Sequence, residues 1–168
     1  TEQRPGRRRA LHAQIADALE ALAPGVVANQ PEVLARHQAE AGLSERAVGA
    51  YQRAGRLALS RSADTEAAAH LRRGLELLPV LPSGKVRDSL ELAFQTSFGI
   101  ALSAANGYAD EGAVAAFERA RALARQVGGH DEMGAIFNGL FVSYSNRAEF
   151  AKALEVANEF MALTEGSN

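Results

Sequence analysis

The sequence predicts an all-α protein in which about eight helices stack as antiparallel hairpins. Alanine, leucine, glutamate and arginine dominate the composition, and these residues have high helix propensity. No stretch shows the alternation of β-branched and polar residues that marks a strand. Proline, glycine and asparagine interrupt the pattern at intervals, which leaves helices of about 11 to 20 residues joined by short connectors. Short connectors favour antiparallel packing of sequential helices.

The first expected helix covers about residues 8–23. Four apolar residues recur along it at spacings of three and four and therefore share one face: Leu11, Ile15, Leu19 and Leu22. Pro31 begins the second helix, because the first helical turn leaves unpaired the N–H group that proline lacks. The shared apolar face is expected to pack against the rest of the protein.

The third and fourth helices are expected at about residues 45–60 and 64–78. Ser44 is the expected N-cap of the third helix, and Ser62 or Asp64 that of the fourth, since short polar side chains accept hydrogen bonds from free N–H groups. His70 is expected at the edge of the packed face of the fourth helix, four residues after Glu66, with Arg72 and Arg73 in solvent.

The second half of the chain repeats this arrangement. Four more helices are expected at about residues 86–105, 111–127, 132–146 and 149–164. Asp110 and Asp131 stand at helix starts, where acidic side chains cap free N–H groups and complement the helix dipole.

Hairpins at about residues 10–42, 44–79, 86–128 and 132–165 are expected to form a single domain over residues 10–168. Residues 1–9, with Arg4, Arg7, Arg8 and Arg9, are interpreted as a basic linker from an upstream domain.

The charge balance disfavours binding to nucleic acids or membranes. The 18 basic residues nearly match the 20 acidic ones, so no global field attracts a polyanion. No apolar run reaches the ~18 residues that a membrane-spanning helix needs. Cysteine is absent, which excludes thiolate metal sites and fits a reducing compartment. A cytoplasmic location is therefore expected.

No catalytic, cofactor-binding or metal-binding residue is predicted. The four histidines, His12, His37, His70 and His130, include no pair at the i, i+4 spacing and no HExxH motif. The segment "LPSGKV" lacks the first glycine and the hydroxyl residue of a phosphate-binding loop. No G-x-S-x-G motif occurs. The fragment is accordingly not expected to be an enzyme or to need a cofactor.

Residues 48–81 show the spacing of a 34-residue helix-turn-helix repeat that ends near Pro79. Its characteristic positions hold Tyr51, Ala54, Gly55, Ala58, Ala67, Leu71 and Gly74. Gly55 is expected to face Ala67 and Gly74, because small residues let two helix backbones approach closely. Related patterns contain Phe98, Gly99, Phe117 and Ala120, and then Phe137, Leu140, Tyr144 and Ala153, with Phe141 where a small residue is usual.

This spacing resembles the tetratricopeptide repeat. The segments "LHAQIADALEAL", "QPEVLARHQAEAGLSERAVGAYQRAGRLALSRSADTEAAAHLRRGLELLPVLP" and "RDSLELAFQTSFGIALSAANGYA" are similar to the tetratricopeptide region of bacterial proteins that combine a class III nucleotide cyclase domain with a STAND-type ATPase. The resemblance implies a right-handed α-solenoid and upstream cyclase and ATPase modules. It implies a non-catalytic interaction and regulatory role within a larger signalling protein.

The repeat geometry of that family implies a concave surface that binds a protein or peptide, or other domains of the parent chain. The positions expected on this surface are Gln52, Arg56, Thr96, Ser103, Asn138, Ser145 and Asn146. The apolar face of the final segment, "FAKALEVANEFMAL", also suggests a homodimer through terminal helices. Two alternatives are the helical-repeat domain of an ATPase-type transcriptional regulator and an all-α enzyme with an unrecognised site.

Overall fold

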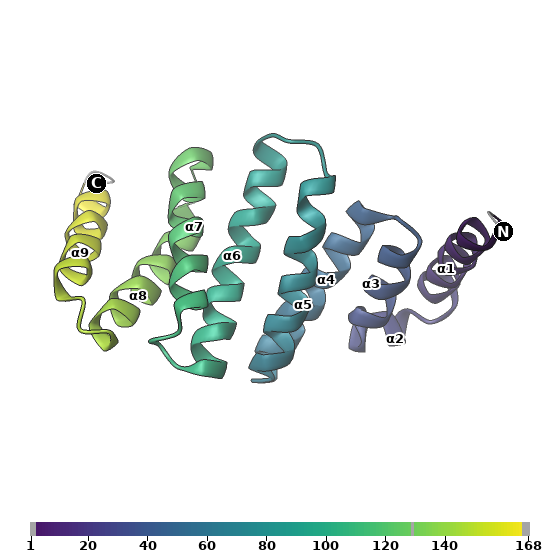
Figure 1. Ribbon diagram of the computed structural model, residues 1–168, viewed down its shortest axis with the longest axis horizontal. Helices are drawn as coiled ribbons and strands as arrows, with labels where there is room; N and C mark the ends of the chain where they lie inside the picture. Colours follow the sequence, from purple (N-terminus) through teal and green to yellow (C-terminus); the bar gives the residue numbers. More distant parts are fainter. Residues whose placement is uncertain (1–2, 129, 166–168) are drawn as a thin grey trace. The chain divides into compact units, whose positions relative to one another are not determined.

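Figure 1 shows the computed structural model, which describes residues 3–128 and 130–165. Within these ranges the chain is helical apart from its connections, and no strand is present. The helices are α1 (Gln3–Leu22), α2 (Pro24–Asn29), α3 (Pro31–Glu40), α4 (Ser44–Ser60), α5 (Asp64–Leu77), η1 (Leu78–Val80, a 3-10 turn), α6 (Lys85–Asn106), α7 (Glu111–Val127), α8 (His130–Asn146) and α9 (Phe150–Glu165). The all-α prediction is confirmed, with α2 as an additional short helix.

The chain divides into two compact units, and the boundary falls between Pro82 and Ser83. Unit 1 contains α1 to α5 and η1, and unit 2 contains α6 to α9. The single domain expected over residues 10–168 stays a prediction. Helix α1 already begins at Gln3, so Arg7, Arg8 and Arg9 of the expected basic linker lie within a helix. The right-handed solenoid stays a prediction.

Sequential helices pack as pairs within each unit. In unit 1, α1 packs against α3, and α4 packs against both α3 and α5. In unit 2, α6 packs against α7, α7 against α8, and α8 against α9. This arrangement fits an all-α helical-repeat fold. None of the described helices combines the length and the apolar character that would let it cross a membrane.

Gly55 allows close contact between α4 and α5. A Cβ atom added at Gly55 would lie 2.6 Å from Cγ of Leu71, and Leu71 itself is fully buried. Ala67 and Gly74, which were expected to face Gly55, are also buried on α5. The side chain that fills the space over the glycine is therefore Leu71, and the smaller residues lie one turn to either side of it.

Phe117 plays the corresponding part in unit 2, where it touches glycines on two other helices. A Cβ atom added at Gly99 of α6 would lie 2.8 Å from the Phe117 ring, and one added at Gly139 of α8 would lie 2.5 Å from it. The ring is 2% exposed. One aromatic side chain of α7 therefore sets the spacing of three helices.

Three connections between helices use the same backbone turn. The residue two positions before the next helix has a positive φ angle, which is 79° for Gly42, 55° for Ser62 and 57° for Ala148. In each turn, the N–H of the following residue donates to the carbonyl oxygen five residues earlier, at 2.9 to 3.0 Å. This is the Schellman arrangement that ends a helix. Two of the three positions carry a side chain where glycine would be unstrained.

This turn explains why the serine caps predicted for α4 and α5 are wrong. The residue after the positive-φ position becomes the N-cap, and these residues are Leu43 and Ala63, which have no capping side chain. Ser44 and Asp64 are the first helical residues, and Ser62 is itself the positive-φ residue.

The caps predicted in unit 2 are correct where the structure describes them. The Asp110 carboxylate accepts a hydrogen bond from the Ala113 N–H at 2.8 Å and so caps α7. Gly128 ends that helix in the left-handed conformation, with φ 79°. Asp131 lies in the first turn of α8, where its charge complements the helix dipole.

Helix α1 buries less of its apolar face than the sequence predicted. Leu11 is 55% exposed and Leu22 is 83% exposed, while Ala16 is fully buried. Ile15 and Leu19 are half-buried. Within unit 1, α1 packs against α2 and α3, and these contacts leave Leu11 and Leu22 exposed.

Replacing Gly139 by alanine is expected to lower the free energy of unfolding by about 1–3 kcal/mol, because the new methyl group would overlap the Phe117 ring. Gly134→Ala on the same helix is the matched control, since no atom lies within 4 Å of its added Cβ. The control should gain up to about 1 kcal/mol from helix propensity. Urea unfolding followed by circular dichroism measures both. Equal effects of the two substitutions would contradict this account of the packing.

Replacing Ala148 by glycine is expected to stabilise the protein by about 0.5–1 kcal/mol, because it removes the strain of the positive φ angle. Gly42→Ala is the reciprocal test and should destabilise it by a similar amount. Thermal unfolding of both variants provides the measurement. A loss of stability in Ala148→Gly would argue against the turn geometry described above.

Candidate functional site

A concave site lies within unit 1, where α2 and the start of α3 face α4. Its cavity has a volume of about 480 Å³. We call it the α2–α4 groove, and it is lined by Glu20, Pro24, Val27, Ala28, Pro31, Arg53, Arg56 and Leu57. This volume falls in the range of small-ligand pockets.

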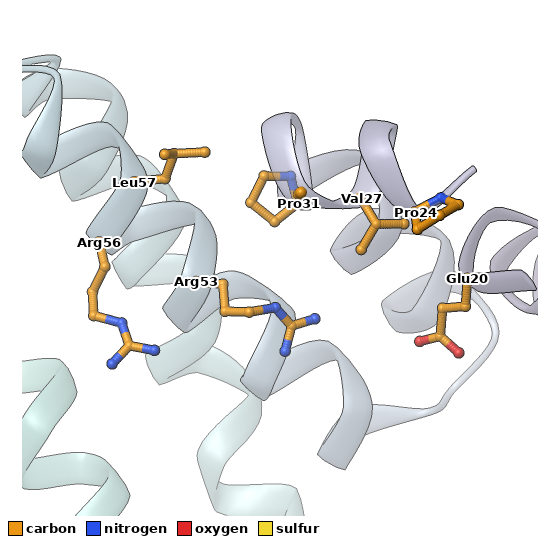
Figure 2. A pocket seen from close by; sticks show the side chains of 8 residues that line it. Glu20, Pro24, Val27, Pro31, Arg53, Arg56 and Leu57 are labelled. Carbon is orange, nitrogen blue, oxygen red and sulfur yellow. The ribbon is translucent and has the colours of Figure 1, made fainter.

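Two prolines form much of the apolar wall. Pro24 and Pro31 are the first residues of α2 and α3, where the absence of an N–H costs nothing. The preceding residues, Ala23 and Gln30, have non-helical backbone angles, as expected before proline. One helix therefore ends and the next begins at each proline, and this places both proline rings beside Val27 at the groove (Figure 2).

The other wall carries two arginines. Figure 2 shows Arg53 and Arg56 projecting from α4, with Pro24, Val27 and Pro31 across from them. The two residues are three positions apart and therefore neighbours on the helix surface. Both are exposed, and within the described ranges neither forms an ion pair or hydrogen bond with another residue. The two arginines therefore lie beside an apolar wall without an acidic partner in an ion pair, and they are called uncompensated in this sense.

Glu20, the one acid among the described lining residues, is already engaged. Its Oε1 accepts a hydrogen bond from Nε2 of Gln38 at 2.9 Å, and its Oε2 accepts one from Nη2 of Arg46 at 2.6 Å. Arg46 also donates to Asp17 at 2.9 Å, and these hydrogen bonds raise the pKa of Arg46. Both Glu20 oxygens thus have donors on other residues, and in the described structure this carboxylate forms no ion pair with Arg53 or Arg56.

Of the seven residues that were predicted to share a binding surface, Gln52 and Arg56 belong to unit 1 and the other five to unit 2. Arg56 lines the α2–α4 groove, and Gln52 lies half-buried one turn earlier on α4. Asn138 lines a different hollow in unit 2. Ser145 is half-buried and Asn146 is exposed, but the amide of Asn146 donates to the Val142 carbonyl at 2.8 Å.

Thr96 and Ser103 do not lie on an open surface, which corrects their assignment to the concave face. Each is 6% exposed. The Thr96 hydroxyl donates to the Leu92 carbonyl at 2.9 Å within its own helix. The Ser103 hydroxyl is buried and has no hydrogen-bond partner in the described structure. Neither hydroxyl is available to a partner in this conformation.

Sequence reasoning identified Arg56 but missed Arg53 and the proline wall. The signal was present in two parts, a pair of arginines at i, i+3 on α4 and two prolines seven residues apart. Nothing in the local pattern indicates that these segments face each other. Their proximity depends on α2, a helix that the sequence analysis did not predict.

A second hollow, of about 290 Å³, lies between α8 and α9. Its apolar lining consists mainly of Phe137, Phe141, Val156, Phe160 and Met161. The rings of Phe137 and Phe160 stack with centroids 5.3 Å apart, while Phe141 is 44% exposed. The large residue at position 141, where the repeat pattern expects a small one, therefore points outward and leaves this pair of helices with an open apolar surface.

The contacts of the histidines include one pair that the sequence did not indicate. His70 contacts Glu66 at 3.5 Å, as predicted, and the side chain of His130 lies outside the described residues. His12 and His37 have no metal-binding spacing in the sequence, but the fold brings their Nδ1 atoms to 2.9 Å from each other. Burial lowers the pKa of His37, and the neighbouring His12 and Arg36 lower it further.

The described ranges contain no cluster of three or more histidine, cysteine, aspartate or glutamate side chains arranged to hold a metal ion. The groove with its two uncompensated arginines is thus the site whose chemistry is best defined. Comparison with protein-family models, curated proteins and solved structures finds no match for this chain.

Proposed function

We propose that this chain is a protein-interaction segment and that its α2–α4 groove binds an acidic stretch of a partner protein. The observation that supports this most directly is the pair of uncompensated arginines, Arg53 and Arg56, beside the proline wall. A guanidinium group donates two parallel hydrogen bonds to a carboxylate. The apolar wall opposite can hold an aliphatic side chain of the same segment, so the groove suits acidic and apolar residues in close succession.

The wider role that we propose is regulatory. The repeat spacing around Gly55 resembles tetratricopeptide regions attached to nucleotide cyclase and STAND ATPase modules. In such a parent protein, an acidic segment in the groove would belong to another domain or to a separate partner. Binding there would favour one arrangement of the parent over another by its differential affinity for the two.

The α8–α9 surface supports a second candidate, self-association through the terminal helix. Phe150, Leu154 and Met161 recur at helical spacing on α9 and are 53% to 67% exposed. An exposed apolar stripe of this kind is typical of contact surfaces.

Groove binding can be tested by fluorescence anisotropy with a labelled peptide that contains paired glutamates beside leucines. Arg53→Gln and Arg56→Gln should each weaken binding about three- to tenfold, because each removes a guanidinium that pairs with a carboxylate. Arg61→Gln is the matched control, since Arg61 is exposed at the end of the same helix and lies outside the groove. A peptide with glutamines in place of the glutamates should bind less tightly.

Two results would contradict groove binding. Equal weakening by all three arginine substitutions would indicate non-specific charge attraction. Tighter binding of single-stranded DNA than of the acidic peptide, with a steep dependence on salt, would instead favour the alternative of a transcriptional regulator's helical-repeat domain.

Self-association is expected to appear in sedimentation velocity as a concentration-dependent rise in the sedimentation coefficient. Leu154→Lys should abolish the rise, because it places a charge in the middle of the exposed stripe. Val86→Lys replaces another exposed apolar residue, 78% exposed on α6, and should leave the rise unchanged. A protein that is monomeric at all concentrations would exclude this candidate.

A further inference from the structure

Two histidines from different helices of unit 1 lie close together, and each faces the other with its Nδ1 atom. His12 belongs to α1 and His37 to α3, and their Nδ1 atoms are separated by 2.9 Å. The rings are tilted by 38°, with centroids 5.0 Å apart, and the pair is partly buried. No other described pair of histidines is brought together in this way.

The Nδ1 atom of a neutral imidazole donates a hydrogen bond when it carries the proton. When the other ring nitrogen carries the proton, the lone pair of Nδ1 accepts a hydrogen bond or binds a metal ion. At 2.9 Å the two Nδ1 atoms cannot both carry a proton without repelling each other. The contact therefore has two chemical interpretations. One ring donates a hydrogen bond to the other, or both rings present lone pairs to a shared cation.

The separation between the two nitrogens restricts which cation fits. With metal–nitrogen bonds of about 2.0–2.1 Å, nitrogens at the observed spacing subtend an angle of about 90° at the metal. That is the angle between adjacent ligands in square-planar and octahedral complexes. A tetrahedral ion such as structural Zn²⁺ requires a wider angle and hence more widely spaced nitrogens.

We propose that His12 and His37 form a two-histidine site for a divalent transition metal ion with tetragonal or octahedral coordination, represented by Cu²⁺ or Ni²⁺. Imidazole nitrogens are favourable ligands for both ions, and such geometries suit them. Water supplies the remaining ligands, because the described ranges hold no third histidine or carboxylate positioned to complete a cluster.

The residues next to the pair on both helices are exposed to solvent. Arg8 and Glu40 lie about one helical turn away on α1 and α3 and form an exposed ion pair at 3.2 Å. Their side chains are 69% and 46% exposed, so this ion pair contributes little to stability and does not seal the site from solvent.

A bound ion would connect α1 to α3. Ala16 is the one fully buried side chain among the described residues of α1, so this helix gains little from burial alone. Because the ion binds the folded arrangement and not the separated helices, its binding is expected to stabilise the attachment of α1.

The test is isothermal titration of the chelator-treated, untagged full chain with NiCl₂ and, separately, CuCl₂. We expect one ion to bind per chain, and His12→Gln and His37→Gln should each weaken binding about tenfold or more, because one imidazole remains. His70→Gln is the matched control, since His70 is partly buried on α5 beside Glu66 and away from the pair. Its affinity should equal that of the wild type. Circular dichroism checks that each variant keeps its helical content.

Electron paramagnetic resonance of the Cu²⁺-loaded wild-type chain gives a readout that needs no variant. Hyperfine splitting from two equivalent imidazole nitrogens would support the site. Splitting from a single nitrogen, or a titration in which His12→Gln binds as tightly as the wild type, would overturn the proposal and assign the contact to an N–H···N hydrogen bond.

Discussion

The contact between a glycine on one helix and a large side chain on the next is the constraint on which both units depend. In unit 1, Leu71 lies directly on the backbone of Gly55, and in unit 2 the Phe117 ring lies between Gly99 and Gly139. A side chain at any of these glycines would occupy space that the neighbouring residue already fills. The helices therefore approach at a spacing that the large residue determines, and residues on their outer faces take their positions from it.

The same contact explains how much of the fold could be predicted from the sequence. Helix propensity and breaker residues predicted the long helices, because both act over a few neighbouring residues. Gly55 and Leu71 were recognised as repeat positions, although the expected partners of Gly55 were the small residues. The serine caps failed because Ser62 adopts a positive φ angle within a Schellman turn, and composition favours a capping role for serine in general.

The candidate site was less accessible to prediction, since it depends on contacts between segments. Thr96 was assigned to a surface from its place in the repeat pattern, but it is buried and bonds to its own helix at Leu92. Arg53 was overlooked because only the short helix α2 brings Pro24 and Val27 opposite it. Likewise, no spacing rule brings together two histidines 25 positions apart in the chain.

The α2–α4 groove and the histidine pair both use α1 or its immediate neighbours, and this follows from how α1 is held. Where a glycine and a large side chain interlock, a polar substitution would break the packing. Helix α1 is instead attached through Ala16 and through polar contacts such as those of Glu20 with Gln38 and Arg46. Charged and titratable side chains can occupy such an interface without disrupting a core. Because these contacts are individually weak, a ligand in the groove or an ion between His12 and His37 is expected to change how firmly α1 is held.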